Sequence, residues 1–292
     1  MICLFDLGAD ISRIVLIAFI FSAIEQITQW RPQQRLRPLW RQDLLYLALN
    51  GFLIQVLTIG GLSIFVLATN PLVPPTGKAA IQALPLWIAT PAAIILADLG
   101  FYGAHRLFHA SPLLWRFHKI HHSIEDMDWL AGHRVHPVDQ SLTKTLSLGP
   151  VLALGFSDAA LAIAGAIYGW HSVLLHSNTR IDFGPLARVI ASPRFHHWHH
   201  ANQPEAYDKN FAGQISAWDL LFGTQYLPKT ARPKVLGVDD PPPAGYGRQL
   251  LYPFASTARA RRSAKNAEPE NVSTPAQISA NVAACAQVNA SP

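Results

Sequence analysis

Long apolar stretches alternate with short polar segments in the first part of the chain. The longest of these stretches, Leu44 to Thr69, contains no charged residue over 26 positions. At about 1.5 Å per residue, a helix of this length exceeds the roughly 30 Å thickness of a bilayer's hydrocarbon core. The pattern therefore predicts a membrane-spanning helix.

A second apolar stretch, Ala79 to Ala104, has Asp98 as its only charged residue. We predict a second span here, kinked at Pro85 and Pro91, since neighbouring helices in a membrane protein compensate for the hydrogen bonds that a proline removes. An ionisable side chain near the end of a span is costly and usually functional, which makes Asp98 a candidate site residue.

Three shorter apolar stretches complete the pattern. Ile14 to Ile24 has charged residues at its ends but neither the basic start nor the cleavage site of a secretory signal, so we expect a retained membrane anchor. Thr145–Ser157 and Ala159–Leu175 are joined at Asp158 and would form helical arms of only about 20–25 Å. We expect these two arms to enter and leave the membrane on one side as a hairpin.

Positive charge orients the predicted spans. The segment before the long span carries four arginines, whereas the next loop, Asn70 to Lys78, carries a single lysine. The positive-inside rule makes the arginine-rich segment cytoplasmic. We therefore expect an all-α integral membrane protein, in the inner membrane if bacterial. It has about three transmembrane helices, a short hydrophobic hairpin and a cytoplasmic helical cap. The four arginines are Arg31, Arg35, Arg37 and Arg41.

Composition agrees with a membrane protein. Hydrophobic residues make up 50% of the chain and charged residues 14%, well below the roughly 25% charged residues of a soluble globular protein. The net charge of +5 does not form a long basic stripe, so we expect no nucleic acid partner. Cys3 and Cys285 lie at opposite ends, which excludes a disulfide framework and a thiolate metal site.

The histidines carry the candidate chemistry. All 13 lie between His105 and His200. They form three clusters in which residues three or four positions apart share one face of a helix. The clusters are His105 with His109; His118 with His121 and His122; and His196 with His199 and His200. His197 points about 100° away from its neighbour on a helix, so we expect a polar surface residue rather than a ligand there.

Other residues complete the predicted site. His176, beside Ser177, is a further predicted ligand, with His171 and His136 as second choices. Asp98 shares a helical face with His105 and His109, so its carboxylate could accept the second N–H of a ligand ring. An ion pair between Asp98 and Arg106 is the open alternative.

The number of histidines indicates two metal ions. Nine imidazoles exceed the four ligands of one zinc ion. Neutral imidazole also binds iron and copper, so spacing alone does not choose between iron and zinc. The predicted ligands are His105, His109, His118, His121, His122, His176, His196, His199 and His200.

The three clusters, together with the sequence around them, resemble the fatty acid hydroxylase/sterol desaturase superfamily from about Ala92 to Leu227. The further matching segments are Trp115–His122, His176–Asn178, Ser192–Pro193, Asp208–Phe211 and Trp218–Thr224. This resemblance implies an all-helical membrane enzyme that uses two iron ions and O2 to hydroxylate or desaturate a lipid, with Asn210 as a further catalytic residue. It also implies a separate electron donor of the ferredoxin or cytochrome type, and zinc is expected to replace iron in some purified forms.

The resemblance places the catalytic domain, while the apolar stretches, Pro241–Pro243 and the Ala/Ser/Asn-rich composition from about Ser256 place the other parts of the chain. We expect membrane anchor helices over residues 1–91, a catalytic domain over 92–227, a linker over 228–255 and a disordered tail over 256–292. Two other classes of function stay open at this point: a histidine-rich membrane protein that binds or transports metal, and a membrane cytochrome. The sequence does not select the lipid.

Overall fold

The computed structural model describes residues 7–255, so the predicted tail lies outside the described residues. The chain divides into a first unit that ends at Pro253 and a second that begins at Phe254. The described α-helices all belong to the first unit.

The described residues are helical, with no β-strand beyond one isolated bridge between Ala201 and Leu236. This confirms the predicted helical class. The α-helices are α1 (Leu7–Thr28), α2 (Trp40–Thr69), α3 (Pro75–Gln82), α4 (Leu86–Ala110), α5 (Pro112–His122), α6 (Pro137–Leu154), α7 (Asp158–His176), α8 (Pro193–His199), α9 (Ala217–Leu221) and α10 (Tyr246–Leu251). Short 3-10 helices cover Asn70–Leu72, Ala131–His133, Gly184–Arg188, Pro204–Ala206 and Tyr252–Phe254.

Three of the described helices are long and apolar enough to cross a membrane, as predicted. They are α2 with its 3-10 extension to Leu72, α4 and α7. Large apolar side chains of α2 point away from the rest of the protein: Phe52, Ile64 and Leu67 are 63%, 71% and 75% exposed. Such a surface is suited to contact with lipid chains.

Two details of the predicted spans were wrong. The second span does not start at Ala79, because α3 ends at Gln82 and α4 begins after Pro85. Proline has no N–H to continue the earlier helix but fits the start of the next one. The third candidate is α7 rather than α1, which covers the predicted anchor Ile14–Ile24.

The expected arm Ala159–Leu175 corresponds to α7, which is one residue longer at each end. The side chain of Ser157 accepts a hydrogen bond from the Ala160 N–H and caps the helix, so α7 includes Asp158 and continues to His176. Its 19 residues reach about 28 Å. A one-sided hairpin of α6 and α7 stays a prediction.

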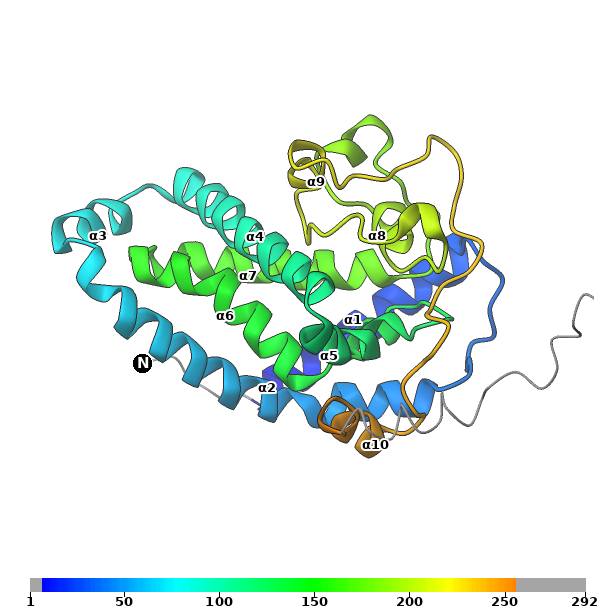
Figure 1. The fold of residues 1–292 in the computed structure, drawn as a ribbon. Coiled ribbons are helices and arrows are strands. Elements are labelled where there is room, and N and C mark those ends of the chain that lie inside the picture. Colours follow the sequence, from blue (N-terminus) through cyan, green and yellow to red (C-terminus); the bar gives the residue numbers. More distant parts are fainter. Residues whose placement is uncertain (1–6, 256–292) are drawn as a thin grey trace, which may run out of the picture. The chain divides into compact units, whose positions relative to one another are not determined.

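Helix α6 packs between α2 and α4 (Figure 1). Gly100 permits the close contact with α4, because a Cβ there would lie 2.5 Å from the carbonyl oxygen of Leu146. The Ser147 hydroxyl donates to the Ala97 carbonyl at 2.7 Å across the same contact. The C-terminal ends of α4 and α7 point away from α3 (Figure 1). This arrangement brings their histidines to one end of the bundle.

A buried ion network ties α2 to the segment after α5. Arg37 contacts Asp128 at 2.7 Å and Oδ2 of Asp43 at 2.6 Å, while Arg134 donates to the same Oδ2 at 2.8 Å and to Oδ1 of Asp43 at 2.5 Å. Arg37, Asp43 and Arg134 are at most 2% exposed. Arg37 is therefore a core residue, although its position in the sequence suggests a loop charge.

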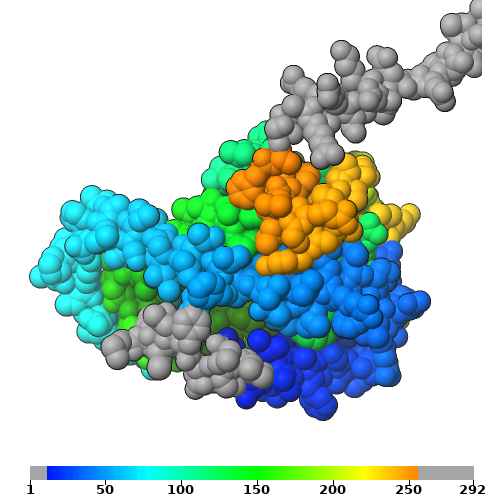
Figure 2. Space-filling model, turned by 90° about the horizontal axis from the view of Figure 1, so that it is seen from below, coloured from blue at the N-terminus to red at the C-terminus, as the bar shows by residue number. Residues whose placement is uncertain are grey.

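The segment expected to be a linker packs against the membrane helices. Gln249 of α10 accepts hydrogen bonds from the Gln42 amide and the Tyr46 hydroxyl, both at 2.9 Å. Figure 2 shows α10 lying against the first turns of α2. Residues 228–253 thus belong to the first unit.

Replacing Asp43 with asparagine tests the ion network. Asp43→Asn leaves the buried guanidinium of Arg134 without its carboxylate, so we expect a loss of about 3–5 kcal/mol of stability. Thermal unfolding of the purified protein in detergent measures this loss. Asp158→Asn, at an exposed helix start, is the control and should cost no more than about 1 kcal/mol. Equal midpoints for the two variants would contradict a stabilising network.

Candidate metal centre

Four helices bring the nine predicted histidines to one end of the bundle. α4 and α7 end in histidines, and the short helices α5 and α8 carry the other two clusters. Both short helices start at a serine cap followed by proline: Ser111 accepts from the Leu114 N–H, and Ser192 accepts from the Phe195 N–H. These caps set the register in which histidines three and four positions apart face inward.

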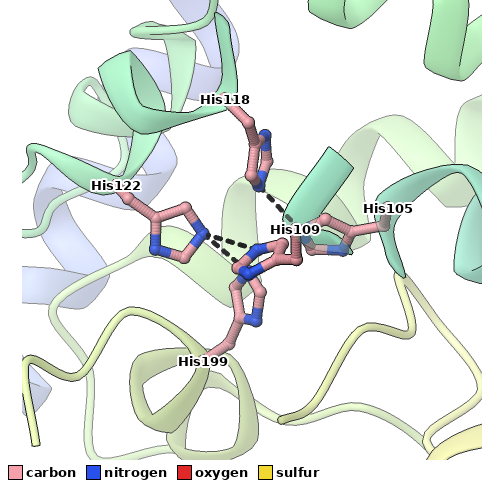
Figure 3. Close-up of side chains that lie close together, drawn as sticks. All are labelled: His105, His109, His118, His122 and His199. Carbon is pink, nitrogen blue, oxygen red and sulfur yellow. Dashed lines mark hydrogen bonds between the residues drawn. The ribbon is translucent and has the colours of Figure 1, made fainter. Parts of the chain in front are cut away.

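The structure gathers all nine rings into two groups. Within each group, the potential ligand atoms lie within 4.8 Å of one another. The first group, drawn in Figure 3, is His105, His109, His118, His122 and His199. The second group is His121, His176, His196 and His200.

Ring nitrogens face one another in the first group. His105 Nε2 lies 2.9 Å from His118 Nε2. His122 Nε2 lies 2.9 Å from His199 Nε2 and 3.2 Å from His109 Nε2 (Figure 3). Five rings from three helices thus direct their Nε2 atoms into one small volume.

The second group has the same arrangement. His176 Nε2 lies 3.1 Å from His121 Nε2 and 2.9 Å from His196 Nε2. His200 Nε2 lies 3.2 Å from His196 Nε2. All four rings are buried, with at most 7% of their surface exposed.

The other nitrogen of these rings decides what the Nε2 atoms can do. His121 Nδ1 lies 3.2 Å from the Arg134 carbonyl oxygen, and His176 Nδ1 lies 2.7 Å from that of Ser172. A carbonyl only accepts hydrogen bonds, so each Nδ1 carries the single proton of a neutral ring and each Nε2 presents a lone pair. These two lone pairs face each other at 3.1 Å. A cation between them removes the repulsion.

The first group repeats this relation. His105 Nδ1 donates to the Phe211 carbonyl oxygen at 2.7 Å, and His118 Nδ1 bonds the Asp139 carboxylate at 2.8 Å. Their Nε2 lone pairs then face each other at 2.9 Å. Each group therefore contains a pair of nitrogens arranged for a positive ion.

The donor set fits metal ions. Two nitrogens bound to one ion at about 2.0–2.1 Å lie roughly 3 Å apart, which matches the distances of 2.9–3.2 Å between paired Nε2 atoms. Burial, followed by the proximity of other rings, lowers the pKa of the histidines on α5 and α8 well below 6.5, so these rings are neutral ligands at neutral pH. They are His118, His121, His122, His196, His199 and His200.

A single chain segment supports three rings of the first group. Asp208 contacts His109 Nδ1 at 3.3 Å, the Lys209 carbonyl accepts from His199 Nδ1 at 2.8 Å, and the Phe211 carbonyl accepts from His105. These partners fix the direction in which each ring presents its free nitrogen.

Asn210 shapes that segment. Its backbone has a positive φ of 61°, a conformation that asparagine tolerates better than most residues. Its side-chain amide donates to the carbonyls of Phe195 and Tyr226 and accepts from the Tyr226 N–H. These contacts are with the backbone and hold the segment in place, while the predicted catalytic role of Asn210 stays a prediction.

Asp98 differs from its expected role. Its carboxylate accepts the backbone N–H groups of Gln214 and Ile215 at 2.8 and 2.7 Å instead of a histidine ring. The alternative ion pair with Arg106 is also wrong, because that guanidinium donates to the Tyr102 hydroxyl. Asp98 therefore holds the chain segment that supplies the Phe211 carbonyl.

Asp139 is the carboxylate that sequence reasoning missed. It lies in the first turn of α6 and contacts His118 Nδ1. Burial raises the pKa of Asp139 to about 7, and a cation in the first group would favour its ionised form. The only signal in the sequence is its position three residues after His136, at a helix start.

The remaining histidines lie outside the two groups. His171 Nε2 contacts the Ala191 carbonyl, and His136 Nε2 contacts that of Leu250, so neither second choice joins the groups. His197 Nε2 donates to the Ser177 carbonyl at 3.1 Å. His197 is fully buried, so its expected position on the surface was wrong, although its ring does point away from the groups.

Comparison with known proteins agrees with this geometry. Residues 90–224, which include all nine rings, match the family model described as fatty acid hydroxylase. This part of the chain is similar to the fatty acid hydroxylase family. The resemblance noted in the sequence is confirmed.

Three relatives illustrate the family. Ornithine lipid hydroxylase of Rhizobium tropici is 31% identical over 166 residues, which are 57% of this chain and 50% of that protein. Alkylglycerol monooxygenase of Homo sapiens is 31% identical over 132 residues, 45% of this chain and 29% of that protein. Methylsterol monooxygenase 1 of Rattus norvegicus is 27% identical over 170 residues, 53% and 55% of the two chains. The chain thus spans between 29% and 55% of these relatives, and no solved structure matches it.

Gly132 allows a direct test of the second group. A Cβ at this position would lie 2.7 Å from Cγ and 2.9 Å from Cβ of His176. Gly132→Ala should therefore displace the His176 ring and reduce bound metal and activity about 10–100-fold, the typical effect of disturbing a ligand's support. Metal analysis beside a thermal unfolding curve measures it.

Gly103→Ala is the matched control, because Gly103 lies in α4 with open space around it. Alanine there should stabilise the helix by roughly 0.5–1 kcal/mol and leave metal content unchanged. Full metal content in Gly132→Ala would contradict a tightly held His176 ring.

Proposed function

We propose that the chain is a membrane-bound, O2-dependent lipid hydroxylase whose two histidine groups each hold one iron ion. The observation that carries the proposal is the pair of opposed Nε2 lone pairs in each group, since two such pairs call for two cations. Similarity to the family supports it, because the relatives' names describe hydroxylases and monooxygenases.

Iron is favoured over zinc by the class of reaction. Zinc has no redox chemistry in proteins, whereas imidazole ligands suit iron equally well. Bound iron would supply the one-electron chemistry by which O2 oxidises an unactivated C–H bond. Zinc in a purified form would be an inactive substitute.

The residues of this chain hold and orient the ions. The nine rings provide neutral nitrogen ligands, and the carboxylate of Asp139 with the carbonyls of Arg134 and Phe211 keeps three of the rings in the required tautomer. Burial of both groups excludes bulk water, which protects a strong oxidant from side reactions. Protein groups thus decide where oxidation occurs, and the metal supplies the oxidising power.

A lipid substrate suits the position of the groups. They lie at the ends of α4 and α7, two helices with membrane-spanning character. Leu107, between His105 and His109 on α4, is 48% exposed and would face lipid. We favour hydroxylation over desaturation because the relatives are named as hydroxylases and monooxygenases, and we expect a separate ferredoxin- or cytochrome-type protein to donate electrons.

A histidine-rich metal transporter is the weaker alternative. Transport requires polar groups along a path through the membrane. The rings instead form two closed, buried groups at one end of the described helices.

Adjacent histidines of α8 separate ligands from bystanders. His196→Gln should lose metal and reduce turnover more than 100-fold, whereas His197→Gln should keep both, because its amide can still donate to the Ser177 carbonyl. We expect the same loss for replacement of any of the nine ligands and no loss for His171→Gln. Iron per protein is measured beside product formed from isotopically labelled O2.

The assay offers an ornithine lipid, an alkylglycerol and a methylsterol with a chemical reductant. Incorporation of one labelled oxygen atom into one of these lipids, with about two irons per chain, is the expected result. Metal loss in His197→Gln with retention in His196→Gln would show that His197, and not His196, is a ligand on α8. A fully active His196→Gln would argue against a metal site in the second group.

The histidine end is proposed to face the cytoplasm. Arg31, Arg35 and Arg41 support this orientation by the positive-inside rule, although Arg37 is buried in ion pairs and adds little. Single cysteines at exposed Glu205 and Arg248 should be labelled by a membrane-impermeant reagent only after the cytoplasmic side is opened. Labelling from the outside would show that the histidine end faces away from the cytoplasm.

A further inference from the structure

Basic side chains gather around Trp30, outside the two histidine groups. We call them the basic surface: Arg31, Arg180, Lys229, Arg232 and Lys234. The segments that carry them, 29–31, 178–182 and 228–236, contain one acidic residue, Asp182, and this carboxylate pairs with Arg194 at 2.6 Å. The positive charge of the surface is therefore not balanced locally.

Hydrogen bonds join these three segments into one surface. The Arg180 N–H donates to the Thr28 carbonyl at the end of α1, and the Arg31 N–H donates to the Asn178 side chain. The Arg31 guanidinium donates to the Lys234 carbonyl at 2.7 Å. Arg180 and Lys234 themselves are exposed, so their charges face solvent rather than the protein interior.

The basic surface lies directly over the second histidine group. The guanidinium carbons of Arg31 and Arg232 lie 5.7 and 5.4 Å from the centre of the Trp30 ring. That ring lies 5.3 Å, centre to centre, from the ring of His197. His197 is the chain neighbour of His196, a member of the second group. The Trp30 and His197 rings therefore extend from the basic surface to the chain neighbour of the candidate ligand His196, although the His197 ring itself points away from the group.

The proposed reaction explains why such a connection is needed. Hydroxylation inserts one atom of O2 into a C–H bond, and the second atom leaves as water after taking up two protons and two electrons. A buried centre has to receive these two electrons from outside. A protein that carries one electron at a time must therefore bind twice per turnover, close to the centre and reversibly.

We infer that the basic surface binds an acidic one-electron carrier protein, which delivers electrons to the second histidine group beside Trp30. This inference rests on the proposed function. Opposite charges on two proteins steer their encounter and align them without requiring tight binding. Anionic lipid headgroups would also bind a positively charged surface, but they do not account for the contact between Trp30 and His197, the chain neighbour of His196.

Charge reversal tests the docking site. Full-length protein in nanodiscs of zwitterionic lipid is compared with Arg180→Glu/Lys234→Glu, using an acidic plant-type ferredoxin as the probe. The variant should bind oxidised ferredoxin at least about 10-fold more weakly at low salt, and the difference should shrink as salt screens the charges. Arg41→Glu/Arg248→Glu, which reverses two exposed charges elsewhere, should bind like the wild type.

Turnover separates this inference from the proposed function. With ferredoxin as donor, Arg180→Glu/Lys234→Glu should have a raised KM for ferredoxin, while turnover with a small chemical reductant stays at the wild-type rate. Equal affinity of all three proteins for ferredoxin would overturn the inference. So would a variant altered only in nanodiscs that contain anionic lipid, since that points to headgroups. Absence of lipid oxidation by the wild type with the chemical reductant would count against the proposed function, and the binding result would still decide the docking site.

Discussion

The opposition of unprotonated ring nitrogens is the constraint on which the rest of this structure depends. Rings that donate from Nδ1 to an acceptor have no proton left on Nε2, and the fold places such nitrogens about 3 Å apart in both groups. A protein without a bound cation would gain nothing from this geometry, because buried lone pairs repel and cannot satisfy one another. The hydrogen-bond acceptors around the rings bind each Nδ1 proton and so keep the Nε2 lone pairs facing one another.

Those acceptors connect the candidate centre to distant parts of the fold. Arg134 offers its carbonyl to His121 and its guanidinium to Asp43 on α2, so the second group depends on a membrane helix that contributes no ligand. In the first group, Asp98 and Asp219 hold the backbone N–H groups on either side of Gly213, and the Phe211 carbonyl of that segment accepts from His105. His121 and His105 are thus positioned by carboxylates that do not touch them, whereas Asp139 and Asp208 contact His118 and His109 directly.

This division explains what could be predicted from the sequence. Spacing of three and four residues is a local property of a helix, and the eight rings it singled out are all among the nine that the structure brings together. The ninth, His176, was predicted from its position beside Ser177. The supporting contacts are not local: Asp98 meets Gln214 across 116 positions of sequence, and backbone carbonyls such as that of Lys209 have no signature at all. Asp98 was therefore given the wrong partner, and Asp139 was overlooked.

The bounds of the helices were likewise predicted from local hydrophobicity alone. Hydrophobicity identified the long helix α2 and the arm that forms α7, whereas the break at Pro85 between α3 and α4 was read as a kink within one helix. His176 is both the last residue of α7 and a member of the second group. The helix therefore had to extend as far as the histidine groups.

The position of the groups reconciles two requirements that oppose each other. A lipid is most accessible from the apolar surface of the bilayer, whereas electrons carried by a soluble protein arrive from water. Under the proposed function, rings at the ends of α4 and α7 would meet both, because apolar helix surface adjoins them on one side and the predicted cap would adjoin them on the other. Neutral imidazole is suited to this boundary, since it binds cations without bringing a negative charge into a buried, weakly polar environment. Histidine in place of carboxylate ligands thus follows from where the centre lies.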